Sequence, residues 1–189
     1  NQVIKRIWGA RGNVTFVFEA GRSPVGRFEF EGADFSVVDG AFISNIQGVF
    51  SALLPPACLS TSFLVDSYAA LVSKVEVNMG NALAKRIDMS ASSGHKSVVI
   101  TNRKPRGSFD PEHVTVATYD IFGKWRTPGT LGAMSLSASG GTGNNLSVTI
   151  PKVRFTAVRP GNRDGQLINN VEFELTLNSL DDEIQIMLT

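Results

Sequence analysis

Apolar and polar residues alternate along much of this chain with the period of two that is typical of half-buried β-strands. The first clear case is NVTFVFEAGRSPVGRFEFEGA at 13–33, where two alternating runs flank the turn GRSP. This pattern predicts a β-hairpin, and its Phe face must be covered by other apolar groups. The same alternation predicts further strands at 73–81 and 96–102.

The second half of the chain contains another predicted hairpin, GAMSLSASGGTGNNLSVTIPKVRFTAV at 132–158. Its turn is GGTGNN, and Pro151 in the returning run predicts a sheet edge or a β-bulge because proline has no N–H to donate. Two closing strands are expected at 167–177 and 183–189, joined by NSLDD. The last of them carries a long edge, which another chain can use for pairing.

The stretch DPEHVTVATYDIFGKWRTPG at 110–129 is the best helix candidate. Asp110 can cap the first turn, and Pro111 suits the first helical position. The β-branched residues at 114–118 favour a competing interpretation, in which a strand there is followed by a short helix at 119–126. A proline–glycine pair ends the helix in both cases, so one short helix is expected.

Residues 34–72 lack a clear period, and we expect a long, partly irregular connection there. Pro55 and Pro56 oppose both a helix and a central strand. The many apolar residues around them predict packing against another surface, either of this chain or of a neighbouring one. Together the patterns give roughly eight strands and at most one helix. The expected fold is therefore mainly β, a β-sandwich or barrel-like fold with one short flanking α-helix.

The expected domain organisation is a single domain over 1–189, which can also be the C-terminal portion of a longer chain. The 18 basic and 17 acidic residues nearly balance, so no global field favours nucleic-acid binding. No apolar run approaches the ~20 residues of a membrane helix, and no signal peptide is visible. Cys58 is the only cysteine in the sequence, which excludes an internal disulfide.

No motif in the sequence predicts catalysis, a cofactor or a metal. His95 and His113 are far apart and have no cysteine pair near them, and Cys58 has no adjacent histidine. The turn GGTGNN lacks the lysine and the following helix of a phosphate-binding loop. We therefore expect no catalytic, cofactor-binding or metal-binding residues and no enzyme activity.

Two sets of charged residues are the candidate functional positions. The acidic set is Glu29, Glu31, Glu172 and Glu174. Its members occur in pairs at i and i+2, so each pair shares one face of a strand. A glycosidase needs neighbouring carboxylates of this kind, but a solvated or channel-facing sheet shows them as well.

The basic set lies in the run HKSVVITNRKPRG and is expected to form a basic loop. Its members are Lys96, Arg103, Lys104 and Arg106. The run lacks the interleaved aromatic residues with which a nucleic-acid-binding surface stacks bases. A solvated loop, or contact with an acidic partner on a neighbouring subunit, is the favoured interpretation.

Five stretches of the chain carry a family resemblance when they are taken in order. They are TFVFEAGRSPVGRFEFEGA at 15–33, SKVEVNMGN at 73–81, ITNRKPRGSFDPEHVTVATYDIFGKW at 100–125, LSVTIPKVRF at 146–155 and DDEIQI at 181–186. The series resembles the major tail tube proteins of long-tailed bacteriophages. It covers most of the chain from about residue 7 onward, with a loose match over 34–70.

The resemblance implies a structural virion protein with a β-sandwich and a flanking helix. Subunits of this kind form hexameric rings that stack into a tail tube, and phage DNA passes through the lumen at ejection without specific binding. The implied partners are other copies of the chain and the tail terminator, tape measure and tail tip proteins. The implied location is the virion tail, after assembly in the host cytoplasm, with no membrane and no cofactor.

Within such a tube, we expect the acidic set to face the lumen, where negative charge repels DNA phosphate, and the basic set to contact the adjacent ring. Two alternatives stay open. One is a related tail component, such as a tail terminator or distal tail protein, or the tube protein of a type VI secretion system. The other is a carbohydrate-binding β-sandwich, which needs exposed aromatic residues on one face. The available ones are scattered in the sequence: Trp8, Tyr68, Tyr119 and Trp125.

Overall fold

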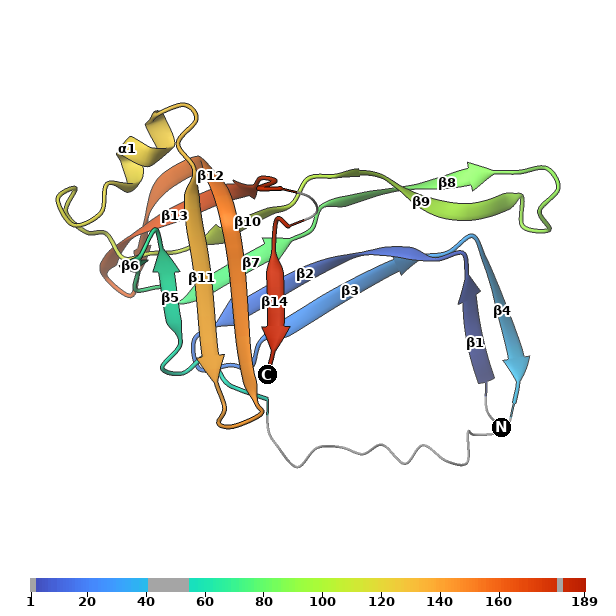
Figure 1. The fold of residues 1–189 in the computed structure, drawn as a ribbon. Helices are drawn as coiled ribbons and strands as arrows, with labels where there is room; N and C mark the ends of the chain where they lie inside the picture. The colour runs from blue at the N-terminus through green and yellow to red at the C-terminus, as the bar shows by residue number, and fades with distance from the viewer. Residues whose placement is uncertain (1–2, 41–54, 180–181) are drawn as a thin grey trace. The chain divides into compact units, whose positions relative to one another are not determined.

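A computed structural model describes residues 3–40, 55–179 and 182–189, and Figure 1 shows the course of the chain. The fold is mainly β with one short helix, as the alternating pattern predicted. The strands are β1 (Val3–Trp8), β2 (Arg11–Glu19), β3 (Val25–Glu31), β4 (Asp34–Asp39), β5 (Ser62–Val65), β6 (Tyr68–Ala69), β7 (Lys74–Asn78), β8 (Asn81–Ile87), β9 (His95–Arg103), β10 (Arg106–Phe109), β11 (Gly132–Ser139), β12 (Asn145–Arg163), β13 (Gln166–Leu175) and β14 (Gln185–Leu188). The helix is α1 (Ile121–Arg126).

The chain divides into two compact units, and the single domain expected over 1–189 stays a prediction. Unit 1 comprises 1–14, 28–52 and 80–103, and unit 2 comprises 15–27, 53–79 and 104–189. Strands β2 and β3 each contribute residues to both units. The long, partly irregular connection expected at 34–72 contains the short strands β4, β5 and β6, while its middle part, 41–54, lies outside the described residues.

Unit 1 contains two antiparallel pairs of strands, β1 with β4 and β8 with β9. The Val98 N–H donates to the Gly9 carbonyl at 3.0 Å, and the Ala33 N–H donates to the Trp8 carbonyl at 2.9 Å. Ala33 and Val98 are also the only buried apolar side chains among the described residues of unit 1. Backbone pairing, rather than a packed core, therefore holds this part of the chain together.

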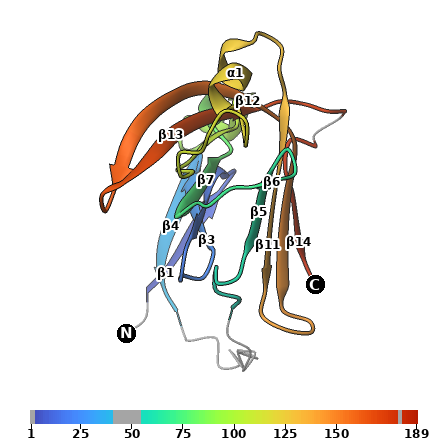
Figure 2. The ribbon, with the colours of Figure 1, turned by 90° about the vertical axis from the view of Figure 1, so that its left-hand side faces the viewer.

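Unit 2 is a two-layered antiparallel sandwich (Figure 2). One layer contains β7, β10, β13 and the second part of β12, with the adjoining end of β2 beside β7. The other layer contains β6, β5, β11, the first part of β12 and β14. The core between them takes its side chains from both layers; it includes Val75, Val77, Phe109, Val171 and Phe173 from the first and Phe63, Val65, Met134, Leu136 and Val148 from the second.

Strand β12 joins the two layers because it is 19 residues long and changes partner along its length. Its first part lies between β11 and β14, and its second part pairs with β13. The pairing with β11 shifts register beside Pro151, between the pairs Met134↔Ile150 and Gly132↔Val153. The irregularity predicted at this proline is confirmed, and such a bulge bends the strand that carries it.

The two predicted hairpins are confirmed, since β2 neighbours β3 and β11 pairs with β12. The two closing strands, however, do not pair with each other. Strand β13 has β10 on one edge and β12 on the other, so it has no edge left for the last strand. Strand β14 pairs instead with β12, beside the first part of that strand.

Helix α1 begins after Asp120, whose side chain accepts a hydrogen bond from the Gly123 N–H at 2.7 Å. The competing interpretation of a short helix at 119–126 is therefore close to the observed one, and the predicted cap at Asp110 is wrong. Asp110 Oδ1 accepts hydrogen bonds from the Ser73 and Lys74 N–H groups instead, at 2.9 and 2.8 Å. The strand considered at 114–118 does not form either, because these residues lie in an irregular segment that ends in a turn.

Candidate functional site

Polar side chains cover the outer surface of the first layer of unit 2. Alternate residues of β7, β10 and β13 point into the core, so the residues between them point outward together. We call this surface the polar face; its residues are Lys74, Glu76, Asn78, Arg106, Ser108, Arg154, Arg159, Glu172 and Glu174. The surface is hollowed into a groove, whose lining includes Glu76, Arg106, Ser108, Glu172 and Glu174.

The acidic residues of the polar face are paired with arginines across β12 and β13. Arg154 Nη2 donates to Glu174 Oε2 at 2.7 Å, and Arg159 donates to Glu172. In addition, Arg106 lies directly opposite Glu174 in the pairing of β10 with β13. Glu172 and Glu174 therefore share one face, as their spacing predicted, but that face carries both signs of charge. Its position in a lumen stays a prediction, and simple repulsion of DNA by unpaired carboxylates does not describe this surface.

The other acidic pair lies in β3, where every side chain is exposed. Glu31 forms an ion pair with Lys85 of β8 at 3.4 Å. The aromatic residues between the acidic ones, Phe28 and Phe30, lie parallel with ring centroids 6.2 Å apart and are 63% and 67% exposed. The covering expected for the Phe face of this hairpin is present for Phe18, which lies in the core, and for Phe16, which packs against it. The described residues of the chain do not supply it for Phe28 and Phe30.

The basic set does not form one loop. Lys96 and Arg103 lie in β9, near its two ends, and Arg106 begins β10. Lys104 is the member that lies between strands. The strand predicted at 96–102 is confirmed as β9, which takes in two members of the basic set and continues as far as Arg103, with Asn81 of β8 opposite it. The proposed contact of these residues with a neighbouring ring stays a prediction.

Eleven large apolar side chains are exposed among the described residues of unit 1. We call them together the unit 1 apolar surface, although neighbours such as Ile7 and Trp8 point to opposite faces of their strand. The residues are Val3, Ile7, Trp8, Phe28, Phe30, Phe35, Val37, Val38, Ile87, Met89 and Ile100. In the pairing of β1 with β4, Ile7 lies opposite Phe35, and these side chains are 52% and 73% exposed. A two-stranded sheet is at best marginally stable in water, and exposed apolar patches of this kind mark surfaces that bind another molecule.

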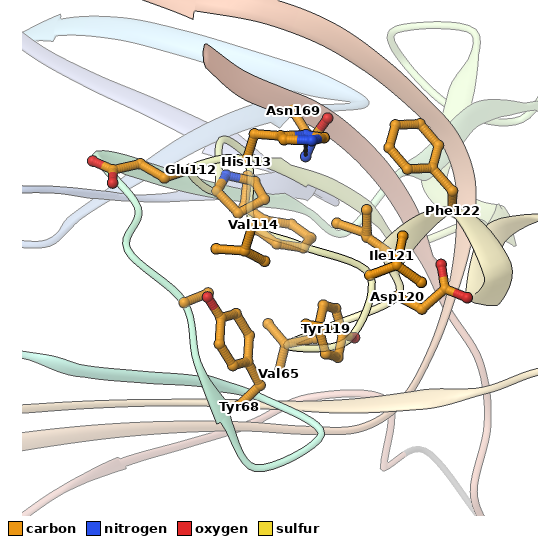
Figure 3. A pocket seen from close by; sticks show the side chains of 14 residues that line it. Val65, Tyr68, Glu112, His113, Val114, Tyr119, Asp120, Ile121, Phe122 and Asn169 are labelled. Atoms are coloured by element: carbon orange, nitrogen blue, oxygen red, sulfur yellow. Dashed lines mark hydrogen bonds between the residues drawn. The ribbon is translucent and has the colours of Figure 1, made fainter. Parts of the chain in front are cut away.

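Unit 2 has a small apolar pocket beside α1, shown in Figure 3. Asn169 of β13 lies at its inner end with 2% exposure, and its side-chain nitrogen is 3.3 Å from His113 Nδ1. Asn169 Oδ1 has no hydrogen-bond partner among the described residues. The space in the pocket is about 30 Å³, and a water molecule placed there can satisfy such an atom.

The wall of this pocket also bears on the carbohydrate-binding alternative. Tyr68 and Tyr119 stack on each other with ring centroids 5.0 Å apart, and both are partly buried. The Tyr119 hydroxyl donates to Asp66, and burial together with this carboxylate raises the pKa of Tyr119. These two rings pack inside the protein, so they do not form an exposed platform for a sugar.

The two histidines and Cys58 lie in different surroundings in the structure. His95 begins β9, while His113 lies against Phe122 in the pocket. Burial raises the pKa of the Cys58 thiol, which opposes formation of the nucleophilic thiolate. Among 3–40, 55–179 and 182–189, no group of three or more His, Cys, Asp or Glu residues is arranged to hold a metal ion. In the same residues, no helix has the length and apolar character needed to cross a membrane.

Two partly buried polar contacts were not predicted from the sequence. Asp66 accepts hydrogen bonds from Tyr119, Lys124 and the Ala133 N–H, and so connects α1 to β11. Arg163 donates to Asp110 and Glu112 at 2.9 and 3.0 Å. Both contacts join residues that are far apart in the sequence, so no short sequence motif indicates them. They fix the outer parts of the sandwich and leave its polar face open.

Comparison with known proteins does not identify the chain: no protein-family model matches it, and no curated protein shows significant similarity to it.

Proposed function

We propose that this chain is a structural tail tube subunit, which assembles into stacked rings around a channel for phage DNA. The observation that carries the proposal is the unit 1 apolar surface. The described part of unit 1 buries two apolar side chains and exposes eleven large ones, which is the reverse of what an independent soluble domain does. Contact with further copies of the chain removes this apolar area from water.

The form of unit 2 supports the same proposal. Its polar face forms a groove of mixed charge on the sandwich. A channel for DNA needs a hydrated wall of this kind, without a strong positive field that would hold phosphate. The ordered resemblance of five stretches to tail tube proteins gives the assembly its specific form, hexameric rings in a tail. The partners are then other copies of the chain and the tail terminator, tape measure and tail tip proteins.

The proposal is tested by the assembly state of the purified chain at increasing concentration. Sedimentation velocity and negative-stain electron microscopy are expected to show rings or tubes with a regular axial repeat. The double variant Ile7→Ser with Phe35→Ser removes two exposed apolar side chains that lie opposite each other in β1 and β4. It is expected to keep the fold and to raise the concentration needed for assembly at least tenfold.

The control for this variant is Arg6→Ser with Ser36→Ala, which changes the neighbouring opposed pair on the same two strands and leaves the apolar residues in place. The control is expected to assemble like the unchanged chain. The proposal is wrong if the unchanged chain remains monomeric at all concentrations and the apolar-to-serine variant has the same solubility and sedimentation behaviour.

A further inference from the structure

Strand β14 forms an open edge of the sandwich in unit 2. It pairs with β12 along residues 146–149 of that strand, and its other edge has no strand partner among the described residues. The pairing extends to the final residue, because Asn145 and Thr189 exchange both backbone hydrogen bonds, at 2.6 and 3.0 Å. The strand is thus fixed in one register, with a fixed set of backbone groups on its outer edge.

The exchange between Asn145 and Thr189 identifies which backbone groups point outward. Hydrogen-bonded and non-hydrogen-bonded pairs alternate in an antiparallel ladder. Met187 opposite Ser147 and Gln185 opposite Thr149 are therefore hydrogen-bonded pairs, as Asn145 and Thr189 are. By the same alternation, the N–H and C=O groups of Ile186 and Leu188 point away from β12. These two residues carry the groups that a further strand can pair with.

The side chains of β14 favour such pairing. Ile186 and Leu188 lie opposite the buried Val148 and Leu146, and so on the core side of the layer. Nevertheless they are 37% and 77% exposed, because the core is incomplete at this edge. The strand has the sequence QIML, without the lysine, proline or bulge by which natural edge strands avoid pairing.

We propose that the outer edge of β14 binds β3 of a second copy of this chain, through the backbone groups of Ile186 and Leu188. Strand β3 is an end strand of the same ten-stranded sheet, and its side chains are exposed. Phe28 and Phe30 alternate with charged residues, as Ile186 and Leu188 alternate with Gln185 and Met187. When the apolar side chains of both strands lie on the same side of the joined sheet, the core of one copy continues into the next.

The choice of β3 rests on the proposed tail tube function. A contact of β14 with another β14 is two-fold symmetric and ends at a dimer. A contact of β14 with β3 is heterologous: in the resulting pair, one copy keeps an unused β3 and the other an unused β14, so the contact can repeat until a ring closes. Each junction also removes two open strand edges from water.

The test is a proline substitution that removes an outward N–H and leaves the pairing with β12 intact. Ile186→Pro does this, and proline is tolerated in edge strands where its nitrogen faces solvent. Its control is Ile186→Ala, which shortens the side chain and keeps the N–H. Ile186→Pro is expected to keep the far-ultraviolet circular dichroism spectrum of the protomer. The protein concentration that it needs for assembly is expected to rise at least tenfold, whereas Ile186→Ala should raise that concentration much less.

A cross-linking experiment tests the partner strand without altering the backbone. In a Cys58→Ser background, one preparation carries Met187→Cys and the other Glu29→Cys, so that a short bismaleimide can join only different molecules. Both positions lie on the non-core sides of their strands in the proposed junction, and a cross-linked dimer is expected. Phe28→Cys, on the opposite side of β3, is the control and is expected to give much less product.

The outcomes separate the two proposals. Rings or tubes that form equally well with Ile186→Pro, or equal cross-linking of both β3 positions, contradict the β14–β3 junction and leave the tail tube proposal standing. An unchanged chain that never assembles contradicts the tail tube proposal itself. If Ile186→Pro does not fold, the cross-linking pair alone decides the junction.

Discussion

The Tyr119 hydroxyl donates a hydrogen bond to Asp66 Oδ2 at 2.9 Å, across 53 residues of the chain. Asp66 also accepts hydrogen bonds from Lys124 of α1 and from the Ala133 N–H of β11, and it has a φ of +50° in the turn after β5. Burial acts to raise the pKa of Asp66, but the hydrogen bonds from Lys124, Ala133 and Tyr119 and the charge of Lys124 outweigh it and lower the pKa. This carboxylate therefore fastens α1 to the sandwich in its ionised form.

The first prediction is that Asp66→Asn destabilises the protein by about 1–3 kcal/mol, because the charged acceptor of three hydrogen bonds is replaced by an amide that accepts fewer and does not attract Lys124. Asparagine tolerates the left-handed backbone conformation, so the loss of stability is due to the lost contacts and not to backbone strain. The measurement is urea unfolding followed by circular dichroism. Asp164→Asn is the matched control: Asp164 is exposed and has a φ of +52°, and its change should stay within about 0.5 kcal/mol.

The second prediction concerns the pH dependence of this contact. The pKa of Asp66 in the folded protein lies below the ordinary value of 3.8, so the unfolded chain takes up the proton first as the pH falls. Its stabilisation is complete at neutral pH and is lost progressively as the pH falls through the folded pKa. The difference in unfolding free energy between the unchanged chain and Asp66→Asn should therefore shrink below about pH 4. A difference that is constant between pH 7 and pH 3 contradicts this role.

Much of the fold could be predicted because period-two alternation reports which face of a strand is buried. Val75 and Val77 in β7, and Met134 and Leu136 in β11, are buried as their spacing required. The helix cap could not be chosen in the same way. Asp110 and Asp120 both precede segments that can form a helix, and only a tertiary contact distinguishes them. Asp110 accepts hydrogen bonds from the Ser73 and Lys74 N–H groups and therefore does not cap a helix.

The charged surface could be predicted only in part. The i, i+2 spacing places Glu172 and Glu174 on one face of β13, but it contains no information about the strand beside it. Their arginine partners follow from the register of β12 against β13, which includes a shift between Phe155 and Ala157. The partner of the last strand could not be predicted for a related reason: a local pattern predicts that a strand forms, whereas its pairing depends on which edges the rest of the fold leaves open.

The third prediction concerns Arg163, which donates to Asp110 and Glu112 and whose side chain is 24% exposed. Arg163→Lys keeps the charge but cannot form the same two-pronged contact, so two partly buried carboxylates lose hydrogen bonds. We expect a loss of about 1–3 kcal/mol in unfolding free energy. Arg154→Lys is the control, because its ion pair with Glu174 is largely exposed, and it should change stability by less than about 1 kcal/mol. Equal losses in the two variants would contradict the assignment.

The fourth prediction is about the polar face in the assembled state. If this face lines the channel, Glu172→Lys with Glu174→Lys gives the channel wall a strong positive field, because Arg154, Arg159 and Arg106 remain beside the new lysines. The carboxylates are largely exposed, so the protomer should keep its fold. The assembled variant is expected to retain a short single-stranded oligonucleotide in a pelleting assay, and to release it as the salt concentration rises, whereas unchanged assemblies do not retain it.

The control for this prediction is the exchange Arg154→Glu with Glu174→Arg, which reverses one cross-strand pair and leaves the net charge of the face unchanged. Assemblies of this variant should not retain the oligonucleotide. Assemblies of the lysine variant that form normally but do not bind DNA would place the polar face away from the channel. Loss of assembly in the lysine variant but not in the exchange would place it instead in a contact between copies, where the acidic side chains meet a basic partner. Because the two failures differ in whether tubes form, one set of preparations distinguishes a channel wall from an interface.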